Sequence, residues 1–161
     1  MKLNVLKQWI CDNCGEIINS PADGYVEWLV DENLKIYSFK IVHHAPSSPN
    51  YPRSNCYFYD GNVKKCDMSL EDFVGTIGLT KLLTFLDYGP IHDEDFKFSP
   101  RVKSIREFVE LTRRLIIPYY EEARLYWQIA LEDGFFNGAN EVYIYLPDTL
   151  KDIILKYENN I

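Results

Sequence analysis

The sequence lacks the features that mark secreted, membrane-bound and nucleic-acid-binding proteins. Its first ten residues show no charged start followed by a long apolar run, and no segment approaches the roughly 18–20 apolar residues of a membrane span. We therefore expect a cytoplasmic protein without membrane contact. Lys and Arg number 17 against 24 Asp and Glu, a formal net charge of −7. Because phosphate-backbone affinity comes from clustered Lys and Arg, nucleic acid is not an expected partner.

Common catalytic motifs are also missing from the sequence. There is no His-Glu pair at metal spacing, no serine-centred elbow and no phosphate-cradling glycine loop. No internal repeat or low-complexity tract is present. The sequence therefore predicts no catalytic residue, and a non-enzymatic role is the favoured interpretation.

The composition is that of a folded protein with an unusual number of tyrosines. The 161 residues are 47% hydrophobic and 25% charged, enough apolar surface for a core. Aromatic residues reach 15%, and 12 of them are tyrosines. Since tyrosine can bury its ring and keep its hydroxyl wet, we expect some to line an interface or groove.

The most informative motif is a pair of cysteines, Cys11 and Cys14, followed directly by Gly15. Two sulfurs at this spacing can bind one tetrahedral ion, and the glycine permits a tight turn beneath it. A redox pair would need a helix after the second cysteine, and the segment 15–21 is too short for one. Disulfides are disfavoured in the expected compartment. The pattern therefore predicts a zinc knuckle.

The second half of the ligand set comes from His43 or His44 and from Cys56 or Cys66. In an extended segment His43 shares the apolar face of Tyr37, Phe39 and Ile41, where a structural metal would lie, whereas His44 shares the face of Ser38 and Lys40. The proline-rich loop 45–55 can double back and bring Cys56 to the end of that strand. The predicted site is Cys11, Cys14, His43 and Cys56, with His44 or Cys66 as alternatives in the second pair. Four protein ligands leave no open position, so the Zn²⁺ is expected to be structural.

The stretch 9–66 resembles the zinc-ribbon-like knuckles, a likeness carried by Cys11, Cys14 and Gly15. The resemblance implies a structural or protein-contact module, with another protein as the expected partner. The long loop between His43 and Cys56 departs from the usual ribbon. The rest of the chain resembles no family.

The pattern of the chain changes near residue 67, which predicts an α+β fold with two domains. Residues 1–66 are expected to form a small antiparallel β zinc-binding module, with a hairpin of strands 25–30 and 34–44. Residues 67–161 are expected to form a mainly helical domain. Helices are expected over 69–74, from Thr80 to the Tyr88-Gly89-Pro90 stop, from Ser99-Pro100 to 117, over 119–133 and over 147–157, with Gly75 and Gly78 as breakers between the first two and a brief strand over 142–146.

Two further segments carry candidate chemistry. The acidic connector His92-Asp93-Glu94-Asp95 can offer ligands to a hard cation, but consecutive residues converge poorly on one ion, and a solvated connector is favoured. In the segment 118–127, Glu121, Glu122 and Arg124 lie among tyrosines. Either they line an enzyme pocket between the two halves, with raised carboxylate pKa values, or the aromatics are core and the charges a surface face. The second interpretation is favoured.

Overall fold

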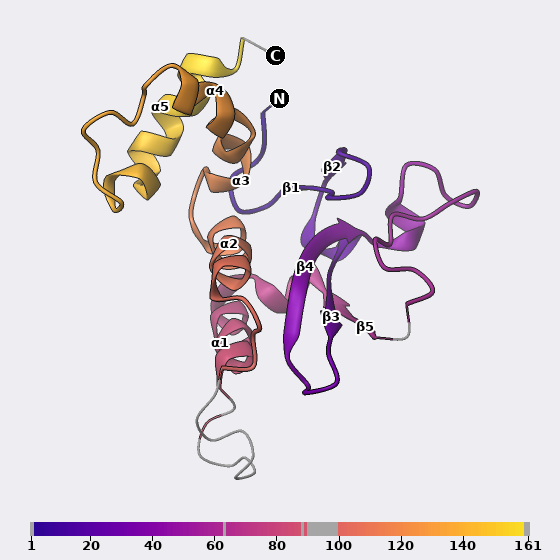
Figure 1. The fold of residues 1–161 in the computed structure, drawn as a ribbon. Helices are drawn as coiled ribbons and strands as arrows, with labels where there is room; N and C mark the ends of the chain where they lie inside the picture. Colours follow the sequence, from indigo (N-terminus) through magenta and orange to yellow (C-terminus); the bar gives the residue numbers. More distant parts are fainter. Residues whose placement is uncertain (1, 63, 88, 90–99, 160–161) are drawn as a thin grey trace.

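The computed structural model describes residues 2–62, 64–87, 89 and 100–159 and shows an α+β fold, as predicted. Two antiparallel sheets occupy the first part of the chain, and helices follow (Figure 1). One sheet has two strands, and the other has three in the order β4-β3-β5. The strands are β1 (Trp9–Ile10), β2 (Ile17–Ile18), β3 (Gly24–Val30), β4 (Ile36–His43) and β5 (Lys65–Ser69).

The predicted hairpin over residues 25–44 is confirmed, because β3 pairs antiparallel with β4. Both strands are rich in β-branched and aromatic side chains, which suit a pleated, half-buried surface. Their register shifts near the middle, where Ser38 adopts a φ of 58°. The bulge resets the alternation of side chains, so that Ile36 is buried and Tyr37 is only partly covered.

Strand β5 corrects the expectation that the chain turns helical at residue 67. It pairs antiparallel with the other edge of β3. Its sequence, KCDMS, is largely polar, as is common in an edge strand. Lys65 forms an ion pair of 3.2 Å with the buried carboxylate of Glu27. Such a strand has no hydrophobic periodicity from which it can be predicted.

The helix predicted from Thr80 starts too late, whereas the capped segment over 69–74 is found as a short helical element. A 3-10 helix, η3 (Leu70–Phe73), forms where the capped segment is expected, and Ser69 accepts a hydrogen bond from the Glu71 N–H. Helix α1 (Gly75–Leu86) then begins before Thr80 and includes both supposed breakers. A Cβ on Gly78 would lie 2.2 Å from the Phe73 carbonyl oxygen. Gly78 is therefore required for close packing and does not break the helix.

The three remaining helical segments occur where the sequence predicts them, but their ends differ from the predicted ones. Helix α2 (Ile105–Ile116) is capped by Ser104, so the predicted start near Pro100 is wrong for the described residues; Ser99 lies outside them. The helical structure is interrupted after α2. It begins again at Tyr120, after Tyr119, whose φ is 68°. The later elements are α3 (Tyr120–Ala123), η5 (Arg124–Tyr126), α4 (Trp127–Glu132), η6 (Tyr143–Tyr145) and α5 (Pro147–Tyr157). The predicted final helix is confirmed, whereas the strand over 142–146 is wrong, since η6 is a 3-10 helix.

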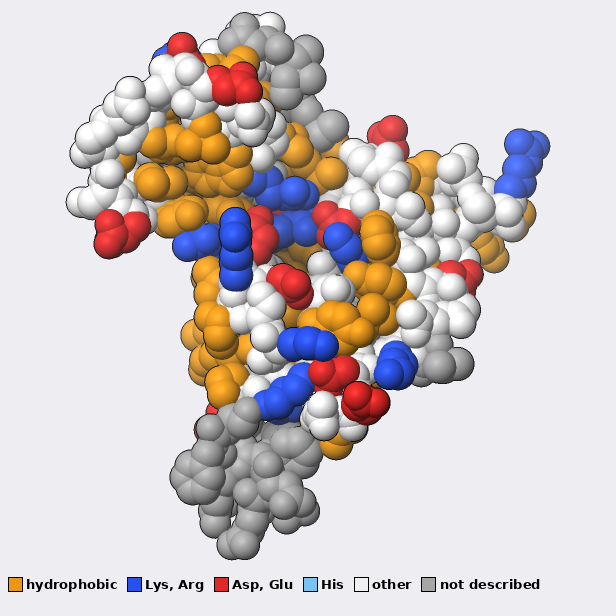
Figure 2. Space-filling view, viewed as in Figure 1, with side chains coloured by type: hydrophobic (Ala, Val, Ile, Leu, Met, Phe, Trp, Pro, Cys, Tyr) orange, Lys and Arg blue, Asp and Glu red, His pale blue; other side chains and the backbone are white. Residues whose placement is uncertain are grey.

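The apolar side chains form two clusters. The first joins Trp9 and both faces of the β3–β4 hairpin region to η3, α1 and α2, ending at Leu115. The second lies within α3, η5, α4 and α5, from Tyr120 to Tyr157. In Figure 1 the second group lies above α2, beside the N-terminal segment, and Figure 2 shows hydrophobic side chains gathered on it. The first cluster draws on both sides of residue 66, and the domain division at 66/67 stays a prediction.

Candidate metal centre

The structure brings together the four side chains that the sequence analysis selects. The ligand atoms of Cys11, Cys14, His43 and Cys56 all lie within 4.8 Å of one another. The two alternatives lie elsewhere: the ring of His44 packs on Tyr25 with centroids 4.9 Å apart, and Cys66 is exposed on β5. This group of three thiols and one imidazole is hereafter the Cys₃His cluster.

The knuckle is a turn held between β1 and β2. Trp9 and Ile10 pair with Ile18 and Ile17, so both ends of the turn are fixed. Within it, the Gly15 N–H donates to the Cys11 carbonyl oxygen over 3.0 Å. Gly15 adopts a φ of +77°, a conformation that side-chain-bearing residues rarely take. The glycine thus closes the turn that points both sulfurs to one side.

His43 is oriented for metal binding by its outer nitrogen. Its Nε2 lies 3.2 Å from the carbonyl oxygen of Ile17. Because a carbonyl oxygen only accepts, Nε2 carries the proton and Nδ1 keeps its lone pair. Nδ1 faces the thiols and lies 3.5 Å from the Cys14 sulfur. A backbone carbonyl that fixes the tautomer in this way is the usual second partner of a metal-bound histidine.

Cys56 reaches the cluster because the loop 45–55 is tied back to the hairpin. The carboxylate of Asp23 accepts from the hydroxyls of Ser20 and Ser47, over 2.7 and 2.8 Å. Ser48 of the same loop is buried, with its Oγ 3.1 Å from the Cys56 sulfur. The predicted doubling-back of this loop is therefore what the structure shows.

The donor set fits a tetrahedral zinc ion. With a Zn–S bond of about 2.3 Å and a Zn–N bond of about 2.0 Å, sulfur and nitrogen ligands of a tetrahedral ion lie about 3.5 Å apart. The Cys14 sulfur and the His43 Nδ1 are 3.5 Å apart. Burial, followed by hydrogen bonds with Cys11 and Cys56, raises the pKa of the Cys14 thiol to about 12. The Cys14 thiol therefore keeps its proton unless a cation is bound, because a coordinating thiol is deprotonated by the ion itself.

Comparison with protein-family models, curated proteins and solved structures gives no match to this chain. The interpretation of the Cys₃His cluster therefore depends on its geometry and its donor atoms. Among the described residues, no helix combines the length and apolar character needed to cross a membrane.

An ionic network that the sequence does not predict lies next to the cluster, centred on Arg114. This side chain is buried, with 6% of its surface exposed. Its guanidinium donates to both carboxylate oxygens of Glu121, over 2.7 and 2.9 Å, and to both of Asp12, over 2.8 and 2.9 Å. A further bond reaches the Ile10 carbonyl oxygen. Since Asp12 lies between the two knuckle cysteines, the network joins the knuckle to α2 and α3.

Asp12 also joins the knuckle to β4. Its N–H donates to the Ile41 carbonyl oxygen over 2.8 Å, and its Oδ2 accepts from the Ile41 N–H over 2.7 Å. One side chain thus contacts the hairpin and the Arg114 guanidinium at once. Asp12 and Arg114 are 102 residues apart in the sequence. Asp12 occupies a position of the knuckle that can hold any residue, and Arg114 belongs to no local motif. No signal in the sequence pairs them.

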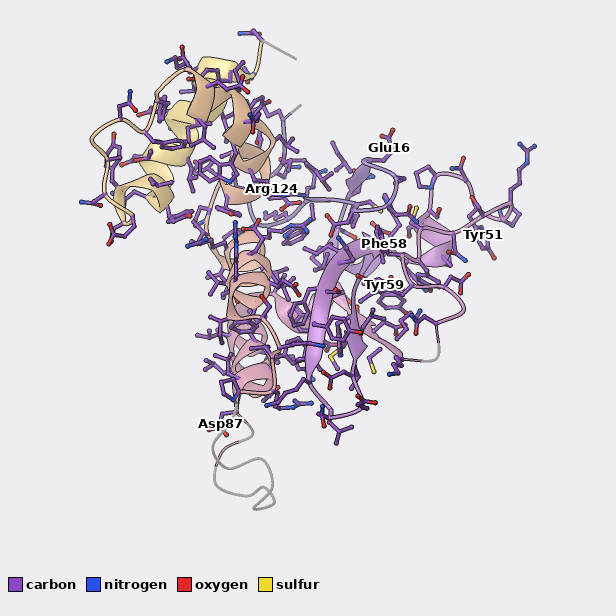
Figure 3. All side chains as sticks on the ribbon, viewed as in Figure 1. Glu16, Tyr51, Phe58, Tyr59, Asp87 and Arg124 are labelled. Atoms are coloured by element: carbon purple, nitrogen blue, oxygen red, sulfur yellow. The ribbon has the colours of Figure 1, made fainter. Side chains whose placement is uncertain are left out.

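The three residues of the predicted enzyme pocket form contacts inside the protein. Glu121 and Arg124 belong to the Arg114 network, and Glu122 is buried against the N-terminal segment. Glu121 is bound by Arg114 and Arg124, and Figure 3 shows Arg124 close to the point where α2 gives way to α3. Burial alone raises the pKa of Glu121, but the charges and hydrogen bonds of the two arginines lower it overall. Glu122 is buried, and its Oε2 accepts from the Leu3 N–H. Neither carboxylate is on the surface face that the favoured interpretation expects, which is a correction.

The cavity beside these carboxylates is small. Glu121 and Glu122 line a space of about 10 Å³ below Leu3 and Trp9, which is about the minimum for one water molecule and admits no substrate. Burial raises the pKa of Glu122, whose Oε1 has no hydrogen-bond partner among the described residues. The aromatic neighbours Tyr120 and Tyr126 are buried in the second cluster, as the core interpretation expects. The acidic connector His92-Asp93-Glu94-Asp95 lies outside the described residues.

Proposed function

We propose that this chain is a zinc protein in which the metal is structural, and that it acts as a protein-interaction or adaptor module. The Cys₃His cluster carries the proposal, because the ligand atoms of three thiols and one imidazole lie within 4.8 Å of one another. Zinc favours this donor set, and four protein ligands leave no position for water or substrate. The ion would hold the knuckle, the end of β4 and the loop 45–55 together, as in the zinc-ribbon-like modules that the knuckle resembles.

The interaction role follows from what the metal does not do. A closed site supplies no hydrolytic water, and the buried carboxylates of α3 hold Arg114 and the N-terminal segment. The polar and aromatic surface between α2 and the C-terminal helices is instead free for contact. A tagged full-length chain should therefore recover a protein partner in stoichiometric amounts, and it should lose that partner when zinc is removed. Recovery of no stoichiometric partner contradicts the adaptor role.

Zinc content measured on the full chain tests the metal assignment. The chain purified without chelators should contain about one zinc per molecule, and Co²⁺ exchanged into it should give the sulfur charge-transfer and visible bands of a tetrahedral Cys₃His site. Cys56→Ser and His43→Ala should lose the ion. The matched controls Cys66→Ser and His44→Ala should keep it. Absence of zinc after purification and reconstitution, or equal loss in the controls, refutes the assignment.

A further inference from the structure

A cleft of about 620 Å³ lies between α2 and the C-terminal helices, with Phe39 of β4 at one side. We propose that it binds a peptide segment of a partner protein that presents a large apolar side chain next to a carboxylate. This inference rests on the proposed interaction role and assigns it a place. The volume is within the range of about 300–1,000 Å³ of ligand sites in proteins.

One wall of the cleft is a fixed group of aromatic rings. Trp127 lies at its centre, with ring centroids 5.2 Å from Phe136, 6.0 Å from Tyr120 and 6.2 Å from Tyr145. The ring of Tyr120 is buried in the second cluster, whereas Trp127 is only partly covered. A wall already held in place costs little conformational entropy on binding, and it offers a flat apolar surface to an incoming side chain.

Two arginines supply the polar part of the cleft. The guanidinium of Arg113 stacks on Tyr145, with its carbon 3.6 Å from the ring centroid, and Arg106 is exposed about two turns earlier on α2. Among the described residues neither has a carboxylate within ion-pair distance. This differs from Arg114, which also lines the cleft but is saturated by Asp12 and Glu121.

The acidic residues of the cleft already accept hydrogen bonds from the protein. Glu107 accepts from the Ser38 N–H over 2.6 Å, and Glu110 accepts from the Tyr120 hydroxyl. The polar rim is thus mixed in sign, with Glu107 and Glu110 beside Arg106 and Arg113. The two arginines can donate to a further group, and their forked geometry matches a carboxylate. Figure 2 shows Lys and Arg side chains gathered beside the hydrophobic surface at this junction. The apolar wall, together with two arginines that lack a carboxylate within ion-pair distance among the described residues, favours an apolar residue flanked by acid.

The test is an NMR titration of the zinc-loaded full chain with the peptide acetyl-Ser-Asp-Phe-Asp-Ser-amide, followed at the Trp127 indole N–H. We expect a saturable shift. Replacing both peptide Asp residues by Asn, or Phe by Ala, should weaken binding about fivefold or more, and Arg113→Gln and Arg106→Gln should each weaken it about fivefold. Arg53→Gln, a matched change on the remote loop, should leave binding unchanged. Unaltered thermal melting of each variant excludes loss of folding.

Several results would overturn the assignment. These are no saturable shift at Trp127, equal binding of the Asn peptide, or unchanged binding to both arginine variants. A titration in which 3-phenylpropionate binds and the peptide does not would make the cleft a small-molecule site instead. If Arg106→Gln and Arg113→Gln chains still recover the stoichiometric partner undiminished, the adaptor role stands and the cleft is not its contact surface.

Discussion

Replacing Arg114 by Met should destabilise the protein strongly, because the change leaves charges without their partner in a dry environment. Arg114 and Glu121 are each 6% exposed, and removing one partner of a buried pair typically costs about 3–5 kcal/mol. Glu121 keeps its bonds from Arg124 and from the Ile10 N–H, and Asp12 keeps its bond from Ile41. The loss is therefore expected near the lower end, about 3 kcal/mol.

Urea unfolding of the zinc-loaded chain, followed by circular dichroism, measures this loss. With a slope of about 1–3 kcal/mol per molar urea, the midpoint should fall by roughly 1–3 M. The matched control is Lys156→Met, which breaks an ion pair with Asp133 whose two side chains are both 49% exposed. Solvent screens that pair, so the control should unfold at the wild-type midpoint.

A second variant separates a stranded charge from lost packing. In the Arg114→Met background, Glu121→Gln removes the carboxylate that has lost its counter-charge. It should therefore cost less there than in the wild type, by about 1–3 kcal/mol, the coupling found for residues in one buried network. An Arg114→Met loss below about 1 kcal/mol, or additive effects within about 0.5 kcal/mol, would refute the view that this network holds the helices to the knuckle.

Two further predictions concern Glu122 and Gly78. Burial raises the pKa of Glu122 above its ordinary 4.5, so its contribution to stability is complete below pH 4.5 and is lost as pH rises through the raised pKa. As the pH rises above 4.5 through the raised pKa of Glu122, the urea midpoint of the wild type should therefore fall relative to that of Glu122→Gln. Parallel pH profiles of the two proteins would contradict this. Loss of zinc at low pH affects both proteins alike. Gly78→Ala should lower stability by about 1–3 kcal/mol through overpacking against Phe73, although Ala favours a helix. The exposed change Thr80→Ala in the same helix should be neutral or slightly stabilising, and equal melting temperatures for the two variants would contradict the packing argument.

The sequence predicts what depends on local pattern. The β3–β4 hairpin follows from two apolar extended segments around a turn, and the choice of His43 over His44 follows from side-chain alternation at the end of β4. That alternation holds only after the bulge at Ser38. Before the bulge Ile36 is buried, so the predicted position of Tyr37 on the buried face is wrong. The start of helix α5 is likewise predicted by Pro147, which lies in its first turn.

What the sequence does not predict depends on contacts between distant segments. Gly78 has the composition of a helix breaker, and only its contact with the Phe73 backbone shows that it belongs inside a helix. Strand β5 has no hydrophobic periodicity, because it forms through backbone pairing with β3 and not through an apolar face of its own. Arg114 looks like a surface residue of an amphipathic helix, yet it is buried because Asp12 arrives from the other end of the chain. The sequence predicts the carboxylates of Glu121 and Glu122 on the surface for the same reason, because a carboxylate is rarely buried without a partner and the partners come from distant segments.

The position of Asp12 inside the knuckle has a consequence for synthesis on the ribosome. All four members of the Cys₃His cluster lie within residues 11–56, whereas Arg114 and Glu121 emerge much later. At about 5–20 residues per second, several seconds separate the two events. With the proposed ion bound, the segment 11–56 would hold Asp12 against Ile41 before α2 exists, and the knuckle would then be the surface against which the later helices dock.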